Sequence, residues 1–457
     1  MSRLTVFVLA GVVFLVGFSM GTAGDLQPFT PLSMEDNKET DTSPEEITEM
    51  MVPVCKLFFD AYPSFKDISG AFSPDGRYFA VSNATSSSMT TTNLFDLKTG
   101  KNIKRFNGLF SHNTISPVAF SPDSRRLAFV SGEPGQLITL PNKNYIVVWD
   151  IPGEKKVCLI PVENTRSDAI IYSLRFSSDG KKLFGVINNT GMIWNIEAQG
   201  AVVKTFSRDT SSDHPFDAFH CYPDLSYAVF SDTKTGKNCL RNLVTNKDVE
   251  QVFNYVSGLG LSWENRPRMV FSDDGQLFAL ETPNWGRGSR LLVWDAATGS
   301  DICTVPLDYK LTAFTFLPGS HTLVTASDPN PEIPHTQSDE QQTSQATPMR
   351  KPVAKTETKA ILEFWDIDNL IWYVEKTNLF PRKIKTAYLE GEDDIHYMVA
   401  SQDGKLLYMR SGKNIVLSGS ILSIANGYIF SLDPDHKPDL PAEIRLDDGV
   451  IVQFSGN

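Results

Sequence analysis

The feature that most constrains this chain is a motif that recurs from about residue 50 to the C-terminus. Each copy has an apolar run, a turn of the Ser-Pro-Asp-Gly type, a second apolar run, a loop and a third run. One residue of the first run marks each copy, and these seven anchors are Phe72, Phe120, Phe176, Phe219, Phe271, Phe316 and Ala400. Without an insertion at 328–359, the anchors lie about 49 residues apart, close to the ~40–50 residues of one repeat in a radial array.

The residue types within the motif predict β-structure. Asp-Gly permits the positive φ angles of a tight hairpin turn, and the flanking runs alternate or carry β-branched and aromatic residues. In three copies the third run ends in Trp-Asp, at Trp149-Asp150, Trp294-Asp295 and Trp365-Asp366. We expect the large ring to pack between adjacent sheets and the Asp to accept backbone hydrogen bonds in the next turn.

A shorter fourth run follows most third runs, so each copy predicts one four-stranded antiparallel sheet. One such sheet cannot bury both of its faces, but sheets arranged radially cover one another. We therefore predict an all-β fold, a seven-bladed β-propeller that occupies residues 51–457 as a single domain. Six and eight blades are the alternatives, because the fourth copy is degraded and the sixth is interrupted by the insertion at 328–359.

The turn and the terminal dipeptide together resemble those of a known superfamily. Phe-Ser-Pro-Asp-Gly with Trp-Asp is similar to the repeats of WD-repeat and YVTN-type propellers, over roughly residues 55–455. The emphasis on Ser-Pro-Asp-Gly also resembles exported TolB-like and quinoprotein-like propellers of bacterial envelopes. The Gly-His dipeptide that usually opens a WD repeat is absent throughout. The resemblance implies the propeller fold, and the hydrogen-bond tetrad of the WD family cannot be carried over.

Two terminal segments compete to close the ring. Residues 55–60 (CKLFFD) look like a fourth strand that lacks its own first three strands. The C-terminal segment 443–454 (EIRLDDGVIVQF) is the alternative, and both segments cannot fill the same place.

The N-terminus predicts export. Arg3 precedes an apolar run at 4–18, and Gly21 and Ala23 have the spacing of a cleavage site, so residues 1–23 are interpreted as a signal peptide. The alternative is an uncleaved membrane tether formed by residues 4–18. Either way we expect a periplasmic or extracellular protein. Residues 24–50 are acidic and poor in large apolar groups, and we predict a disordered leader there, as in the low-complexity insertion.

The net charge and the cysteines indicate which partners and which cysteine chemistry to expect. The formal net charge of -12 argues against nucleic-acid binding. The five cysteines are Cys55, Cys158, Cys221, Cys239 and Cys303. Cys221 and Cys239 lie in one repeat but on its first and third strands, which are not neighbours, so we interpret the cysteines as small buried apolar residues.

The loop lengths predict a binding face. First-to-second and third-to-fourth turns are short and share one face of a propeller. The other face carries the long connections, at 83–93, 131–144, 254–267, 281–289 and 328–359. Long loops on a rigid scaffold usually carry recognition, and Trp and Arg are enriched at binding hot spots. We therefore predict binding residues at Trp263, Arg266, Trp285 and Arg287, although the two Trp rings could instead cover blade edges.

Catalytic motifs are missing from the sequence. It contains no GxSxG, HExxH, Walker loop or GxGxxG-bearing βαβ unit. His220 and His396 fall on first strands that line the channel, and we interpret both as ordinary histidines in a polar lumen. The prediction is a non-catalytic scaffold for an unidentified protein or peptide, without metal or cofactor. The alternatives are a lactonase- or dehydrogenase-like propeller with a channel-bound metal or quinone, and an accessory subunit of an envelope complex.

Overall fold

A computed structural model gives the fold of the chain. It describes residues 8–9, 12–13, 33–36, 47–58, 69–86, 89–109, 117–132, 144–162, 171–187, 190–206, 219–221, 225, 227–232, 237–243, 245, 247–254, 269–282, 290–328, 358–372, 379–390, 395–417, 420–433, 443–445 and 451–453. These parts of the chain contain strands and turns but no helix.

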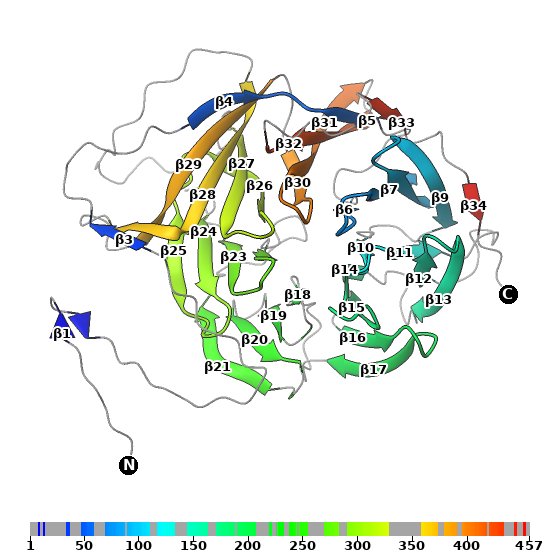
Figure 1. The fold of residues 1–457 in the computed structure, drawn as a ribbon, viewed down its shortest axis with the longest axis horizontal. Coiled ribbons are helices and arrows are strands. Elements are labelled where there is room, and N and C mark those ends of the chain that lie inside the picture. Colours follow the sequence, from blue (N-terminus) through cyan, green and yellow to red (C-terminus); the bar gives the residue numbers. More distant parts are fainter. Residues whose placement is uncertain are drawn as a thin grey trace.

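Seven antiparallel sheets form the blades of a ring, which confirms the predicted seven-bladed β-propeller (Figure 1). Blade 1 consists of β6 (Ser69–Phe72), β7 (Tyr78–Ser86), β8 (Met89–Asp96) and β9 (Lys101–Leu109). Blade 2 consists of β10 (Val118–Phe120), β11 (Arg126–Gly132), β12 (Asn144–Asp150) and β13 (Lys155–Val162). Blade 3 consists of β14 (Ile171–Phe176), β15 (Lys182–Ile187), β16 (Thr190–Asn195) and β17 (Ala201–Phe206). Blades 4 and 5 consist of β18 (Phe219–Cys221), β19 (Tyr227–Asp232), β20 (Lys237–Asn242) and β21 (Lys247–Asn254); and β22 (Met269–Phe271), β23 (Leu277–Thr282), β24 (Arg290–Asp295) and β25 (Asp301–Val305).

Blade 7, unlike blade 6, takes a strand from the N-terminal part of the chain. Blade 6 consists of β26 (Lys310–Phe316), β27 (Thr322–Asp328), β28 (Thr358–Trp372) and β29 (Leu379–Glu390), and blade 7 of β30 (Ile395–Ala400), β31 (Leu406–Leu417), β32 (Ser420–Ser431) and β5 (Cys55–Phe58). The first strands of consecutive blades contact one another around the centre of the ring, and β30 contacts β6.

The N-terminal strand closes the ring. β5 pairs antiparallel with β32, so residues 55–58 supply the fourth strand of the last blade. The two C-terminal strands lie outside this place: β33 (Glu443–Arg445) pairs in parallel with β5, and β34 (Ile451–Gln453) pairs in parallel with β9. The predicted competition is therefore resolved, because each terminal segment has its own position.

A buried hydrogen bond joins blades 7 and 1 at this closure. The Tyr397 hydroxyl donates to the carbonyl oxygen of Gly70 at 2.7 Å. Burial raises the pKa of Tyr397 to about 12, although the Gly70 hydrogen bond acts in the opposite direction. The phenol is therefore a protonated donor at any physiological pH.

Two short parts of the acidic leader are described, and the rest of residues 24–50, where disorder is predicted, lies outside the described residues. β3 (Ser33–Asp36) pairs in parallel with β28, and β4 (Ile47–Met51) pairs in parallel with β29. Met51 is buried in the cluster between blades 6 and 7, so an apolar anchor at the end of the leader accounts for the position of β4.

The core is divided among the blade interfaces. Buried apolar residues of the described chain fall into seven clusters, and each joins two consecutive blades. Trp194 of blade 3, for example, is 1% exposed and shares its cluster with Ile146 and Ile160 of blade 2. Each blade is therefore stabilised mainly by its two neighbours, as expected of a radial repeat.

The Trp-Asp dipeptides occupy the predicted positions. Trp149, Trp294 and Trp365 are all buried between blades. Oδ1 of Asp295 accepts hydrogen bonds from the backbone N–H groups of Ala297 and Thr298, both at 2.8 Å. In blade 6 the strand does not end at Trp-Asp, because β28 continues past a bulge to Trp372.

The fourth repeat shows an error of two residues in the predicted anchors. In the other six blades the anchor pairs with the residue seven positions later, as Phe72 does with Phe79. In blade 4 this relation holds for Cys221, which pairs with Ala228, and not for Phe219. The sequence predicts Phe219 as the anchor because most of the other anchors are Phe, whereas the turn that follows Cys221 determines the register.

Candidate functional site

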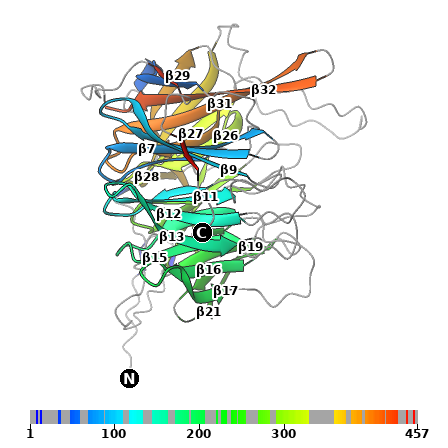
Figure 2. The ribbon, with the colours of Figure 1, turned by 90° about the vertical axis from the view of Figure 1, so that its right-hand side faces the viewer.

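The face with long connections carries a projecting ribbon. β31 and β32 form the second-to-third connection of blade 7 and extend beyond the rest of the ring (Figure 2). β30 accompanies β31 only as far as Ser411, and β5 accompanies β32 only from Asn426 onward. Among the described strands, residues 412–417 and 420–425 therefore pair only with each other.

The register of this ribbon separates its residues into two sets. Lys413 pairs with Ile424, Ile415 with Leu422 and Leu417 with Ser420, and opposite residues of an antiparallel pair share one face. Ile415, Leu417, Leu422 and Ile424 therefore fall in one set of register positions, and Val416 and Ile421, which pair with each other, fall in the other set. A two-stranded ribbon is marginally stable alone in water, so a partner surface would stabilise it.

The four predicted binding residues lie outside the described residues. Trp263 and Arg266 fall between β21 and β22, and Trp285 and Arg287 fall between β23 and β24. Both connections start and end on the same side of the ring as the ribbon, because they join a fourth to a first strand and a second to a third strand. Their role stays a prediction.

One of the expected long loops is mostly strand. β7 continues to Ser86 and β8 begins at Met89, so the prediction of a loop at 83–93 was wrong. The reason is a run of β-branched residues: Thr92 lies opposite Ser82, and its hydroxyl donates to the Ser82 hydroxyl at 3.1 Å. Sequence reasoning also missed the ribbon, although two short apolar runs around Ser418-Gly419 were a signal for a hairpin.

The channel histidines lie where they were expected. His220 is on β18 and His396 is on β30, both first strands. Among the described residues, no group of three or more His, Cys, Asp or Glu side chains has the arrangement of a metal site.

The cysteines of the described chain are buried thiols. Cys55, Cys158 and Cys303 lie on the fourth strands of three different blades, and these three and Cys221 are thiols outside any disulfide. Cys221 and Cys239 lie on β18 and β20, with β19 between them, as the repeat predicted. Burial raises the pKa of the Cys158 thiol, which makes a reactive thiolate unfavourable there.

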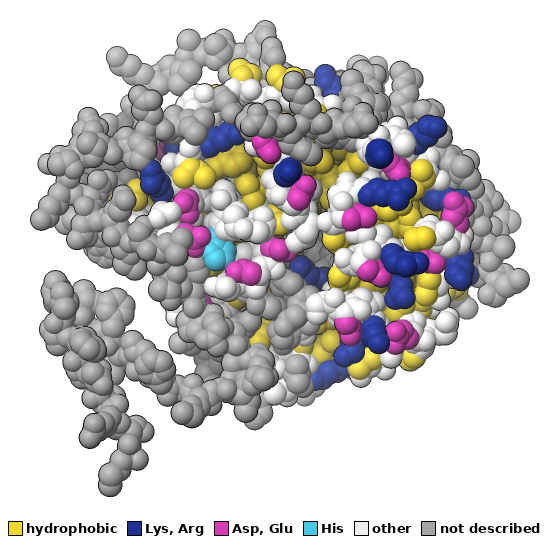
Figure 3. All heavy atoms as spheres, in the orientation of Figure 1, with side chains coloured by type: hydrophobic (Ala, Val, Ile, Leu, Met, Phe, Trp, Pro, Cys, Tyr) yellow, Lys and Arg dark blue, Asp and Glu magenta, His cyan; other side chains and the backbone are white. Residues whose placement is uncertain are grey.

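Hydrogen bonds within and between the short turns stabilise the opposite face, where acidic and basic side chains are interspersed (Figure 3). Five blades share one turn, in which a Ser hydroxyl donates to the Asp two residues later and accepts the backbone N–H five residues later; the pairs are Ser73–Asp75, Ser121–Asp123, Ser177–Asp179, Ser272–Asp274 and Ser401–Asp403. Gly76 has a φ of 69°, so the predicted positive φ of the turn is confirmed.

These turns also join different blades. In blade 2 the left-handed position is occupied by Ser124, with a φ of 59°, and its hydroxyl accepts the backbone N–H of Asp75 in blade 1 at 3.0 Å. The side-chain amide of Gln402 in blade 7 donates to Asp273 in blade 5 at 2.8 Å. The short turns thus form a connected rim that holds the blades in place.

His321 bridges blades 5 and 6 on this rim. Its Nδ1 lies 2.7 Å from Oδ1 of Asp368, and its Nε2 lies 3.0 Å from Oδ2 of Asp274. Burial by itself would lower the pKa of His321, but the hydrogen bonds and charges of Asp368 and Asp274 outweigh it and raise the pKa above 6.5. Both ring nitrogens then donate, which two carboxylate acceptors require.

We expect this bridge to make stability depend on pH. Because the pKa of His321 is higher in the folded protein, its stabilisation is complete below the unfolded pKa of about 6.5 and is lost as the pH rises through the folded pKa. His321→Gln should therefore lower the free energy of unfolding by about 1.5–3 kcal/mol at pH 6, the range for hydrogen bonds to charged groups. Urea unfolding of both proteins from pH 6 to pH 9 measures the difference, which should shrink with rising pH. A difference that stays constant with pH would contradict the charged bridge.

Geometry and topology together define the class of this molecule: a closed β-propeller of seven four-stranded blades. No family of known proteins matches the sequence, and no curated protein matches it either. Solved structures, in contrast, are similar to the chain in fold. A chain of the mitotic checkpoint complex matches with a TM-score of 0.51 and 11% identity, over 86% of this chain and 98% of that one. The β-propeller domain of Cps50 (Swd1) from Myceliophteria thermophila matches with a TM-score of 0.52 and 11% identity, over 84% and 100%. At this identity the likeness shows the fold alone.

No helix among the described residues is long and apolar enough to span a membrane.

Proposed function

We propose that this chain is an exported, non-catalytic scaffold that binds a protein or peptide partner through the long-loop face. The observation that carries the proposal is the ribbon at 412–425, which leaves the sheet of blade 7 and pairs only with itself among the described strands. An apolar ribbon on a rigid ring suits a partner that covers it, because burial of apolar surface then stabilises both. The solved structures similar to this chain support the proposal in kind, since one of them belongs to a protein complex.

The connections that contain the four predicted binding residues start and end on the same long-loop face. Trp263, Arg266, Trp285 and Arg287 belong to connections that leave the ring on the side of the ribbon. Aromatic and Arg side chains around an apolar centre are the usual composition of an interface core. The proposed partner surface therefore combines the ribbon with these two loops.

Shortening the ribbon tests this proposal. Replacing residues 413–424 by Asn-Gly joins Gly412 to Ala425, which are already paired, through a two-residue hairpin turn. We expect partner recovery from the native source, measured by quantitative cross-linking mass spectrometry, to fall by about tenfold or more, while thermal unfolding stays unchanged. The double variant Trp263→Ala, Trp285→Ala should lose the same partner.

Lys181→Gln on the opposite face is the matched control. Lys181 is exposed and pairs only with Glu197 at 3.6 Å, so its loss should leave partner recovery unchanged. Equal recovery with the shortened ribbon and with the control would show that the long-loop face is not the binding face.

Export rests on the sequence of residues 1–23. A positively charged start, an apolar run and small residues at the cleavage spacing support it. The mass of the mature protein measures it: the expected N-terminus follows Ala23, whereas an intact N-terminus on a protein in the cytoplasm would contradict export.

A further inference from the structure

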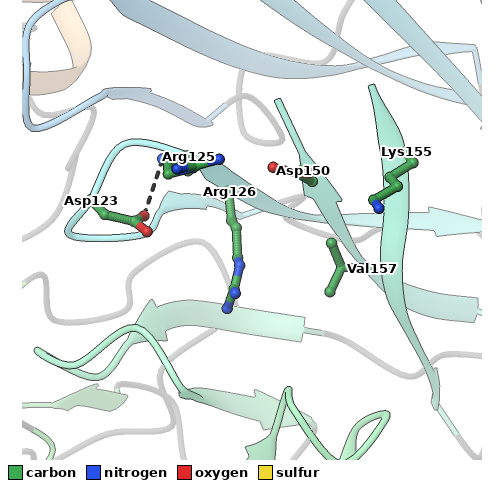
Figure 4. A pocket seen from close by; sticks show the side chains of 6 residues that line it. All are labelled: Asp123, Arg125, Arg126, Asp150, Lys155 and Val157. Carbon is green, nitrogen blue, oxygen red and sulfur yellow. Dashed lines mark hydrogen bonds between the residues drawn. The ribbon is translucent and has the colours of Figure 1, made fainter. Parts of the chain in front are cut away.

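A pocket of about 380 Å³ opens on the short-turn face, between the two turns of blade 2 (Figure 4). Its lining comes from the β10–β11 turn and the adjoining ends of β11, β12 and β13, and consists of Asp123, Arg125, Arg126, Asp150, Lys155 and Val157. It lies on the face opposite the proposed partner surface. Three cationic side chains meet here on a protein whose net charge is -12.

In blade 1 the equivalent Arg and Asp are joined by an ion pair. Tyr78 pairs with Asp96, and Arg77 just before it forms an ion pair with Asp96, with Nε 3.3 Å from Oδ2. The equivalent pair in blade 2 is Arg125 and Asp150, because Arg126 pairs with Asp150. Arg125 and Asp150 form no ion pair with each other, and the pocket lies between them.

The turn after Asp150 explains why its carboxylate is open. In blade 5 the corresponding Asp295 is held by the backbone N–H groups two and three residues later. Two residues after Asp150 stands Pro152, which has no N–H to donate. Gly153 then allows a close approach, because a Cβ there would lie 2.2 Å from Oδ2 of Asp150. Pro152 and Gly153 together leave the Asp150 carboxylate facing Arg125, with no hydrogen bond to the described residues of the turn (Figure 4).

The second carboxylate of the pocket is already satisfied. Oδ1 of Asp123 accepts hydrogen bonds from the Ser121 hydroxyl at 2.5 Å and from the backbone N–H of Arg125 at 3.1 Å. Burial alone would raise the pKa of Asp123, but these hydrogen bonds and the charges of Arg126 and Arg125 lower it. Asp123 is thus an anion that holds its own turn together.

The cations retain donors that nothing in the described chain uses. Arg126 donates through Nη1 to the carbonyl oxygen of Gly180 in blade 3 at 3.3 Å, which fixes its guanidinium beside the pocket. The guanidinium of Arg125 and the ammonium of Lys155 have no ion pair or side-chain hydrogen bond. These are the strong, charge-assisted donors that bind carboxylates and phosphates.

We propose that this pocket binds a carboxylate group of a ligand through Arg125 and Lys155, with Arg126 beside them. The lining carries three cations and two carboxylates, a net charge of +1, so one carboxylate balances it, whereas a doubly charged phosphate leaves an excess negative charge. Asp150 is placed to accept an N–H group next to that carboxylate, and Val157 offers a short apolar wall. The ligand is therefore a carboxylic acid, either free or as an acidic side chain of a peptide.

Titration calorimetry of the intact chain with three probes tests the site: acetate, an acetylated and amidated peptide with one glutamate, and inorganic phosphate. We expect a carboxylate to bind, and phosphate to bind several-fold more weakly. The double variant Arg125→Gln, Lys155→Gln should weaken carboxylate binding at least tenfold. Asp150→Asn should strengthen acetate binding, because a repelling charge is removed.

Lys181→Gln is the control, since Lys181 occupies the position of Arg125 in blade 3 but is paired with Glu197; its affinity should match that of the unaltered chain. Binding of acetate assigns a free acid as the source, and binding of the peptide alone assigns an acidic side chain. A peptide with glutamine in place of glutamate that binds equally well would overturn the proposal. Unchanged affinity in the double variant, or phosphate bound as tightly as carboxylate, would also overturn it.

Discussion

Leu57→Ala should lower the free energy of unfolding by about 2–5 kcal/mol, the range for truncating a buried Leu. Leu57 is fully buried at the interface of blades 7 and 1, where it shares a cluster with Phe79, Phe95 and Tyr408. It belongs to β5, the strand that completes blade 7 although it is far from that blade in sequence. The change removes packing at the closure, where β5 joins the two ends of the ring. Urea unfolding followed by Trp fluorescence measures the loss.

Lys56→Ala provides the control, because Lys56 lies on the same strand but is exposed. Its free energy of unfolding should change by less than about 0.5 kcal/mol. Removing residues 443–457 is a second comparison: β33 and β34 are outer fifth strands, so their removal should cost less than Leu57→Ala. The reverse order would mean that the C-terminal segment closes the ring.

The repeat was predictable because its physical cause is local. A turn with a positive φ, a buried Trp and an Asp that accepts backbone N–H groups recur in the sequence and in the structure, as at Gly76, Trp294 and Asp295. Ring closure was not predictable in this way. The pairing of Cys55 with Ile429 spans nearly the whole chain, and no periodicity within either segment indicates which distant edge it will meet.

In the candidate sites, too, some features could be predicted from the local sequence and others could not. The long-loop face followed from strand order, but the ribbon depends on how far β30 and β5 accompany β31 and β32, which strand propensity does not give. The pocket in blade 2 depends on one missing N–H at Pro152 and on the comparison with Arg77 and Asp96 in blade 1. Such a site is a departure from the repeat, so it becomes visible only when equivalent residues are superimposed in space.

Trp365→Ala should lower the free energy of unfolding by about 3–5 kcal/mol, as expected for loss of a large buried ring. Trp365 is 3% exposed and packs in one cluster with Leu277, Val293 and Cys303 of blade 5. Its Nε1 donates to the Thr325 hydroxyl at 3.1 Å, and the Lys383 ammonium lies 5.4 Å from the ring centroid. The ring therefore combines contacts between blades with polar contacts inside blade 6.

Trp365→Phe separates the two contributions. It keeps an aromatic ring between the blades and removes the hydrogen bond to Thr325, so it should cost about 0.5–1.5 kcal/mol from the bond, plus a smaller packing loss. Tyr309→Ala, at an aromatic residue that is 37% exposed, should change stability by less than about 1 kcal/mol. Packing between blades dominates if the Ala variant is far less stable than the Phe variant. Equal losses in the two Trp365 variants would show that the Trp-Asp motif stabilises this blade through its hydrogen bond, and that the ring could be replaced without loosening the contact to blade 5.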